Sequence, residues 1–200
     1  MEQTVVIKPK MNFTPSREGK KYFVKTFGCQ MNEHDSEKIA GMFELDGMTK
    51  ATLEDSADIM FINTCTIREN ADDRLYGTLG QLKKWKDEGI DRKLLVGGCA
   101  AQKDKELVRE RAPWVDVVIG THNLTNIINL LNQSEDWGPI TEIIDEIEDL
   151  PTDAPSIRES EHSAWLTIQI GCNNSCTFCI VPSVRGPEIS RRPSDIINEA

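Results

Sequence analysis

A regular alternation of short apolar runs and amphipathic segments between residues 21 and 133 is the feature that most restricts how this chain can fold. The apolar runs have the length and composition of buried strands. The segments between them carry apolar residues at the spacing of one helix face. The expected strands lie at 22–27, 58–63, 93–96 and 115–119. This alternation predicts an α/β fold with a parallel sheet covered by helices on both faces, flavodoxin-like in its strand order.

A first set of cysteines, Cys29, Cys65 and Cys99, follows three of these strands at the points where the strands end. The carboxyl ends of parallel strands lie along one edge of a sheet, and ligands bind in the crevice there. We therefore expect the three thiols to converge, with Gly28, Gly97 and Gly98 allowing close approach of the backbone and unusual dihedral angles. Two alternatives stay open. Each cysteine can be a small buried apolar residue, or a structural zinc ion can bind, although it would take four ligands.

A second set of cysteines, Cys172, Cys176 and Cys179, has the spacing C-x3-C-x2-C and follows an apolar run at 165–170 that is typical of a strand. Three thiols in one short loop can hold three corners of a four-iron cluster and leave the fourth iron open to another ligand. The aromatic Phe178 precedes the last cysteine, where a flat side chain can lie against such a ligand. Zinc is again the alternative.

The overall composition favours metal or redox use of the cysteines in the cytoplasm, because there are six cysteines and no export signal. No apolar run approaches the roughly 20 residues that a membrane span needs. The formal net charge is −10, but residues 135–161 alone carry ten acidic groups and one basic group. This local acidity does not exclude RNA binding elsewhere, and Arg185, Arg191 and Arg192 are candidates for phosphate contacts. The histidines, His34, His122 and His162, stand at no ligand spacing to the cysteines and are expected at the surface or at helix caps.

The residues around the second cysteine set resemble a known family. Cys172, Cys176 and Cys179, together with Phe178, are similar to the radical S-adenosylmethionine signature. The longer stretch Gly-Cys-Asn-Asn-Ser-Cys-Thr-Phe-Cys-Ile-Val-Pro-Ser-Val-Arg-Gly, at 171–186, resembles the methylthiotransferases of that superfamily. Further matching blocks are Thr26–Glu37, Asn63–Glu69, Val96–Cys99 and Ser190–Arg192. The resemblance covers about residues 20 to 200.

The resemblance implies two [4Fe-4S] clusters and S-adenosyl-L-methionine as cofactors. Carried over residue by residue, it assigns Cys29, Cys65 and Cys99 to an auxiliary cluster, Cys172, Cys176 and Cys179 to the radical-generating cluster, and Phe178 to the adenine of the cofactor. It also implies tRNA and a reductant such as flavodoxin or ferredoxin as partners. A cytoplasmic monomer with no membrane association is expected.

Gly28–Asn32 is similar to the family subgroup that acts on isopentenyl-adenosine in tRNA. The function implied is a transferase that adds a methylthio group to C2 of N6-isopentenyladenosine next to the anticodon. Two other substrates stay open: threonylcarbamoyl-adenosine in tRNA, and an aspartate of a ribosomal protein, whose subgroup has a proline–lysine pair in place of Gln30-Met31. A non-catalytic metal or electron-carrier module is the further alternative.

We expect four segments along the chain: a flexible arm at 1–20, the α/β domain at 21–133, an acidic linker at 134–162, and the start of a radical S-adenosylmethionine core at 163–200. An α/β barrel needs about 200 residues or more. We therefore expect the last domain to be a truncated barrel, and the chain to be a fragment of a longer enzyme that is inactive alone.

Overall fold

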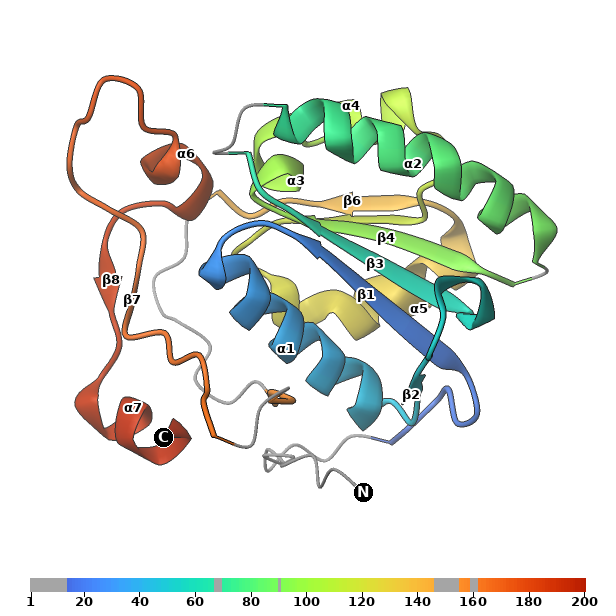
Figure 1. The fold of residues 1–200 in the computed structure, drawn as a ribbon, viewed down its shortest axis with the longest axis horizontal. Coiled ribbons are helices and arrows are strands. Elements are labelled where there is room, and N and C mark those ends of the chain that lie inside the picture. Colours follow the sequence, from blue (N-terminus) through green and yellow to red (C-terminus); the bar gives the residue numbers. More distant parts are fainter. Residues whose placement is uncertain (1–13, 67–69, 90, 146–154, 159–161) are drawn as a thin grey trace.

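The computed structural model describes residues 14–66, 70–89, 91–145, 155–158 and 162–200. A parallel sheet lies between two layers of helices, and a smaller carboxy-terminal segment packs beside it (Figure 1). The strands are β1 (Lys21–Phe27), β2 (Thr49–Lys50), β3 (Ile59–Thr64), β4 (Lys93–Gly98), β5 (Val117–Ile119), β6 (Ile140–Glu142), β7 (Gln169–Ile170) and β8 (Ile189–Ser190). The helices are α1 (Gln30–Leu45), η1 (Glu54–Ser56), α2 (Ala71–Glu88), α3 (Cys99–Asp104), α4 (Leu107–Arg111), η2 (Leu124–Asn126), α5 (Ile127–Trp137), α6 (Val181–Arg185) and α7 (Pro193–Glu199). The predicted α/β class is confirmed.

The main sheet has six strands in the order β2-β1-β3-β4-β5-β6, and every pairing in it is parallel. The first five strands have the flavodoxin-like order, so the predicted strand order is confirmed. All residues of the central strand β3 are buried. Burial on both faces explains why this strand is a near-continuous apolar run in the sequence.

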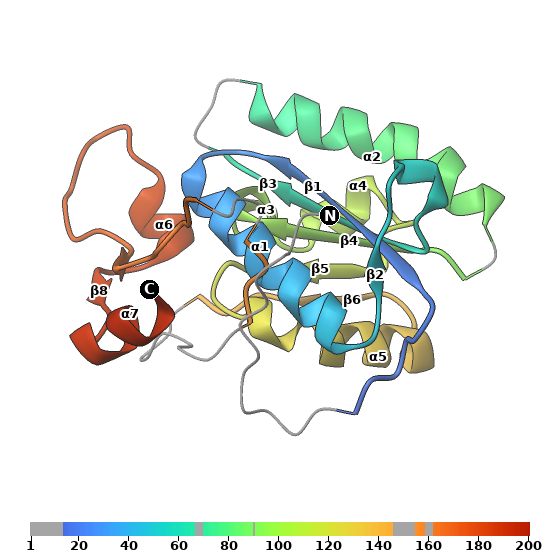
Figure 2. The same ribbon diagram turned by 60° about the horizontal axis from the view of Figure 1, so that its bottom comes forward.

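Side chains of β3 alternate between the two faces of the sheet, so this single strand contributes to both cores. Met60 and Ile62 pack in a cluster with residues of α2, α3 and α4. Ile59 and Phe61 pack in a second cluster with residues of α1 and α5. Figures 1 and 2 show these two groups of helices on opposite faces of the sheet.

The sheet extends into residues 134–162, for which the sequence predicts an acidic linker. Helix α5 continues to Trp137, and β6 then adds a parallel edge strand beside β5. The carboxylate of Glu142 accepts hydrogen bonds from the side chains of Asn123 (2.7 Å) and Asn126 (2.8 Å). An ordered strand is therefore compatible with this acidic composition, because the two amides satisfy the Glu142 carboxylate. Residues 146–154 and 159–161 of the predicted linker lie outside the described residues.

Residues 14–20, at the end of the predicted flexible arm, contact the main domain, and the flexible arm itself stays a prediction. Arg17 is buried, and its guanidinium contacts Asp46 (2.5 Å) and Glu135 (2.8 Å). Ser16 donates two further hydrogen bonds to the Asp46 carboxylate, from its backbone N–H (2.8 Å) and its hydroxyl (2.6 Å). The arm is held because Asp46 is fully buried and needs these partners.

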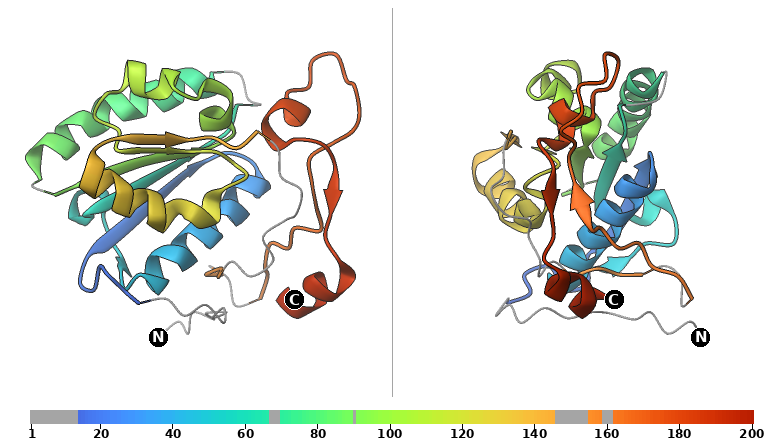
Figure 3. Two further views of the ribbon diagram at one scale, coloured as in Figure 1. Left: turned by 180° about the vertical axis from the view of Figure 1, so that it is seen from behind. Right: turned by 90° about the vertical axis from the view of Figure 1, so that its left-hand side faces the viewer.

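The carboxy-terminal segment, residues 162–200, forms a small unit of two strands and two helices. Strands β7 and β8 pair antiparallel, and the predicted strand at 165–170 shortens to Gln169–Ile170. The views in Figure 3 show this segment along one side of the main sheet, next to the start of α1. Its assignment to the start of a barrel stays a prediction. Among the described residues, no helix combines the length and apolar character that crossing a membrane requires.

We predict that Arg17→Ala lowers the free energy of unfolding by about 3 kcal/mol, because it leaves the buried Asp46 carboxylate without its cation. Urea unfolding followed by circular dichroism measures this loss. Lys84→Ala is the matched control, because Lys84 pairs with Glu88 at the exposed surface and should contribute at most about 0.5 kcal/mol. Equal effects of the two substitutions would contradict a buried anchor for the arm.

Candidate functional site at the carboxyl edge of the sheet

The first cysteine set lies where three neighbouring strands end. Cys65 directly follows β3, and Cys99 directly follows β4 as the first residue of α3. Cys29 lies two residues beyond β1 and is the N-cap of α1. The placement of these residues at strand ends is therefore as the sequence predicts.

The register of the sheet brings these three positions to one edge. Phe27 is paired with Thr64, and Thr64 is paired with Gly98. A cysteine directly follows Thr64 and Gly98, and another lies two residues after Phe27. The backbone N–H of Cys65 continues the ladder by donating to the carbonyl of Phe27 (2.8 Å). Adjacent strands lie about 4.8 Å apart, so the three cysteines occupy neighbouring places along the edge.

Two buried asparagines hold the turns that carry Cys29 and Cys65. The Asn32 side chain donates to Oδ1 of Asn63 (2.8 Å) and to the carbonyl of Thr64 (3.2 Å). Asn63 in turn donates to the carbonyl of Asn32 (2.8 Å) and to the hydroxyl of Ser36 (2.9 Å). This reciprocal pair ties the first turn of α1 to the end of β3. No role for Asn63 is predicted from the sequence, although a polar residue inside a buried apolar run signals a structural hydrogen bond.

Gly98 is required where β4 turns into α3. Its φ is +90°, a conformation that favours glycine. An added Cβ would lie 2.3 Å from Oδ1 of Asn63 and 2.5 Å from the carbonyl oxygen of Thr64. The absence of a side chain at this position therefore lets Cys99 approach the end of β3.

The sulfur atoms of the first set have different environments. Cys65 and Cys99 are buried, whereas Cys29 is half-buried and its Sγ lies 3.4 Å from Oδ1 of Asn32. Burial raises the pKa of the Cys99 thiol, and the positive charge of Arg185 opposes that shift. The Nε–H of Arg185 donates to the Sγ of Cys99 across 3.3 Å. A sulfur atom that can bind a metal and a guanidinium cation are therefore in contact at this edge.

The second cysteine set lies in a more open loop. Cys172 is half-buried, and Cys176 and Cys179 are exposed. The Asn174 side chain donates to the Sγ of Cys172 (3.3 Å). Phe178 is 97% exposed. Its contact with the adenine of the cofactor stays a prediction.

The structure corrects the predicted surface positions of several basic residues. Arg185 and Arg191 are buried, so they are not free to contact a phosphate backbone, whereas Arg192 is exposed. His34 and His122 are buried rather than exposed, and burial lowers the pKa of His34 to about 4. For Arg191 and His34, packing of the carboxy-terminal segment on the main domain explains the difference, since both contact Glu199 in α7.

Thiols are ligands that suit iron–sulfur clusters and zinc, so both cysteine sets fit the expected group in donor chemistry. Within the described ranges, however, no three His, Cys, Asp or Glu side chains are arranged closely enough to hold a metal ion. The fold brings the first set to one edge and the second set to one loop. The ligand assignments of all six cysteines stay predictions.

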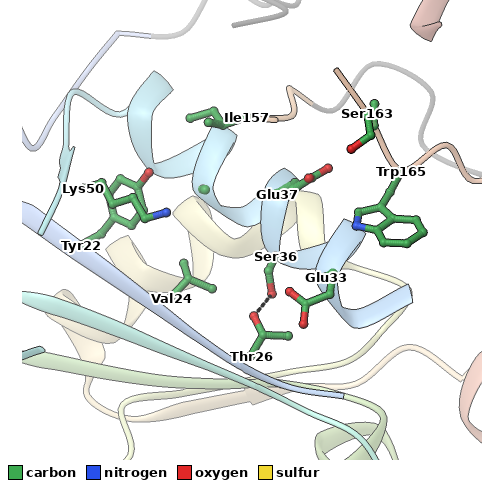
Figure 4. Close-up of a pocket in the computed structure, with 12 residues that line it drawn as sticks. Tyr22, Val24, Thr26, Glu33, Ser36, Glu37, Lys50, Ile157, Ser163 and Trp165 are labelled. Carbon is green, nitrogen blue, oxygen red and sulfur yellow. Dashed lines mark hydrogen bonds between the residues drawn. The ribbon is translucent and has the colours of Figure 1, made fainter. Parts of the chain in front are cut away.

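A separate cavity of about 210 Å³ lies between β1, α1 and the segment around Trp165 (Figure 4). Its lining includes Glu33, and also Thr26 and Ser36, whose hydroxyls are hydrogen-bonded (2.8 Å). None of the described residues that line it is a cysteine. This cavity is therefore distinct from the candidate site.

The fold and the site define a flavodoxin-like α/β protein with cysteines at the carboxyl edge of its sheet. The family described as "Uncharacterized protein family UPF0004" matches residues 21–120, which is half of the chain and contains Cys29, Cys65 and Cys99. The chain belongs to this family.

Curated relatives are similar over nearly the whole chain. A protein of Corynebacterium efficiens is 51% identical over 92% of this chain, one of Corynebacterium jeikeium is 50% identical over 100%, and one of Tropheryma whipplei is 54% identical over 89%. Each of the three is named tRNA-2-methylthio-N(6)-dimethylallyladenosine synthase. The aligned regions span 36% of the first relative and 38% of the other two.

We predict that Gly98→Ala lowers the free energy of unfolding by about 3 kcal/mol, because alanine is strained at this φ and its methyl group would clash with Thr64. Chemical unfolding of the metal-free chain measures the effect. Gly77→Ala makes the same change in α2, where nothing lies within 4 Å of the added carbon, and should stabilise by about 0.5–1 kcal/mol. Stabilisation by both substitutions would contradict the proposed need for glycine at 98.

Proposed function

We propose that this chain forms the amino-terminal part of a radical S-adenosylmethionine methylthiotransferase that acts on tRNA. The observation that carries the proposal is the position of Cys29, Cys65 and Cys99 at neighbouring strand ends, beside a segment that contributes three more cysteines. The names of relatives that are 50–54% identical support the same function. In this proposal, residues 163–200 belong to the beginning of a barrel domain.

Each cysteine set would bind one [4Fe-4S] cluster through three thiolates, which leaves one coordination position open in each. The residues concerned are Cys29, Cys65 and Cys99 for the auxiliary cluster, and Cys172, Cys176 and Cys179 for the radical-generating cluster. When bound with S-adenosylmethionine, these groups would supply methyl transfer to sulfur and a radical that removes hydrogen from C2 of adenine.

The protein's own residues position and shield these ligands. The Asn32–Asn63 pair holds the turns that carry Cys29 and Cys65. Phe178 offers an exposed aromatic ring next to Cys179, suited to contact the adenine of the cofactor. We also propose a flavodoxin or ferredoxin as the reductant, and a monomeric state in the cytoplasm.

The proposed substrate is N6-isopentenyladenosine next to the anticodon of tRNA. The Gly28–Asn32 sequence supports this choice over threonylcarbamoyl-adenosine and over a ribosomal-protein aspartate. In the structure this stretch is the turn from β1 into α1, so its residues lie at the same edge as the cysteines.

A gene deletion tests the substrate. Mass spectrometry of tRNA nucleosides should detect loss of the methylthio group from isopentenyl-adenosine in the deletion strain, and its return when the full-length gene is restored. The full-length gene carrying Cys99→Ala should not restore it, because one cluster ligand is missing. Loss of the group from threonylcarbamoyl-adenosine or from a ribosomal protein instead would refute the substrate.

Iron content tests the two cysteine sets. After anaerobic reconstitution with iron and sulfide, we expect about eight iron atoms per chain, since each cluster holds four. Cys172→Ala and Cys99→Ala should each remove about half of the iron, and visible absorption should fall in proportion. Metal analysis and spectroscopy of the purified chain measure both quantities.

Ser175→Ala is the matched control, because it changes a neighbouring loop residue that is not a proposed ligand. It should leave the iron content unchanged. One equivalent of zinc, with no visible absorption after reconstitution, would favour the metal-carrier alternative. Unchanged iron content in Cys172→Ala would refute the assignment of the second set.

A further inference from the structure

Arg185 forms a buried bridge between the two parts of the chain. It is the last residue of α6, which follows the second cysteine set, and only 3% of it is exposed. Its Nε–H donates to Cys99 Sγ (3.3 Å), and its Nη2 donates to the Asp35 carboxylate (2.7 Å). Cys99 begins α3 and Asp35 lies in the second turn of α1, so one guanidinium joins α6 to two helices of the main domain.

The backbone beside Arg185 holds the second cysteine set. The carbonyl of Gly186 accepts a hydrogen bond from the N–H of Cys172 (3.2 Å). A continuous path therefore leads from the sulfur of Cys99 through Arg185 and Gly186 to the backbone of Cys172.

A second contact fixes α6 in the same place. The Thr121 hydroxyl, just beyond β5, donates to the carbonyl of Val184 (2.7 Å). Val184 is itself buried. Thr121 contacts neither cysteine set in these hydrogen bonds, so it can be used to loosen α6 without altering the bond to Cys99.

The choice of arginine is physically important. A guanidinium has several donors in a fixed plane, and can bond a sulfur and a carboxylate at once. A buried cation needs such partners, and Asp35 supplies the compensating charge. Lysine has the same charge but donates from a single nitrogen, so it cannot reproduce this planar bridge.

We propose that Arg185 is a positioning residue that orients Cys99 and fixes the loop of Cys172, Cys176 and Cys179 against the first cysteine set. For the metal-loaded protein, this inference rests on the proposed function. In that protein the Nε–H of Arg185 should donate a hydrogen bond to the Cys99 sulfur that binds the cluster. Such a bond favours the reduced cluster and raises its reduction potential.

Hydrogen exchange and thiol labelling of the metal-free, reduced chain test the bridge without any cluster. In Arg185→Ala, amides of 181–186 and of Cys172 should exchange at least about tenfold faster, because a buried charge pair is broken. Iodoacetamide should label Cys99 at least about tenfold faster when the rate is expressed per thiolate from its dependence on pH, a correction that is needed because loss of the arginine also raises the pKa of the Cys99 thiol. Arg192→Ala removes an exposed arginine close by in the sequence and should change neither rate.

Two further variants separate the bridge from general loosening. Arg185→Lys should accelerate both rates while β3 amides stay protected, since the charge is kept and the planar bridge is lost. Thr121→Val should accelerate exchange in 181–186 with a smaller effect on Cys99 labelling. Wild-type rates in both Arg185 variants would overturn the proposal, as would exposure of β3 in Arg185→Lys equal to that of 181–186.

The loaded protein gives a second readout. In a chain whose second cysteine set is replaced by alanine, an electrochemical titration followed by electron paramagnetic resonance should give a lower potential for Arg185→Ala than for Arg192→Ala. Equal potentials would overturn the role of Arg185 at the sulfur. Failure of the proposed function is distinguishable, because it would appear as absent iron or unmodified tRNA while the metal-free exchange rates still depended on Arg185.

Discussion

The parallel pairing of β1, β3 and β4 is the constraint on which the rest of the structure depends. Its register aligns the ends of the three strands, and each strand is followed within two residues by a cysteine. The two apolar cores fix that register, because a shift by one residue would turn Met60 and Phe61 to the wrong faces of the sheet. The positions of the cysteines along the edge thus follow from burial of the strands.

Polar groups fix the conformation of the turns that carry the cysteines, which burial of the strands does not determine. The Asn32–Asn63 pair is buried and mutually bonded, and leaving either amide without its partner would cost about 1–3 kcal/mol. Gly98 removes the steric barrier at the end of β4. Arg185 then adds the carboxy-terminal segment through Asp35 and Cys99. Apolar packing, hydrogen bonds between amides and ion pairing thus all contribute to the structure of one edge of the sheet.

The sequence was sufficient where structure depends on local periodicity. Buried strands such as β3 are recognisable from their apolar runs, and the strand ends place Cys65 and Cys99 directly. The edge strand β6 has only a weak sequence signal, because it is short and lies in an acidic segment, where neighbouring asparagines satisfy Glu142. The burial of Arg185 could not be predicted, since its partner Asp35 is 150 residues away in the sequence. Long-range polar contacts of this kind leave no local pattern.

In our proposal, Cys29, Cys65 and Cys99 together bind one metal cluster at the edge of the sheet. Diffraction from crystals of the reconstituted chain, measured on both sides of the iron absorption edge, tests it most directly. We predict an anomalous iron signal that is bonded to the sulfur atoms of all three cysteines. A signal bonded to fewer of them, or a zinc signal in its place, would contradict the claim.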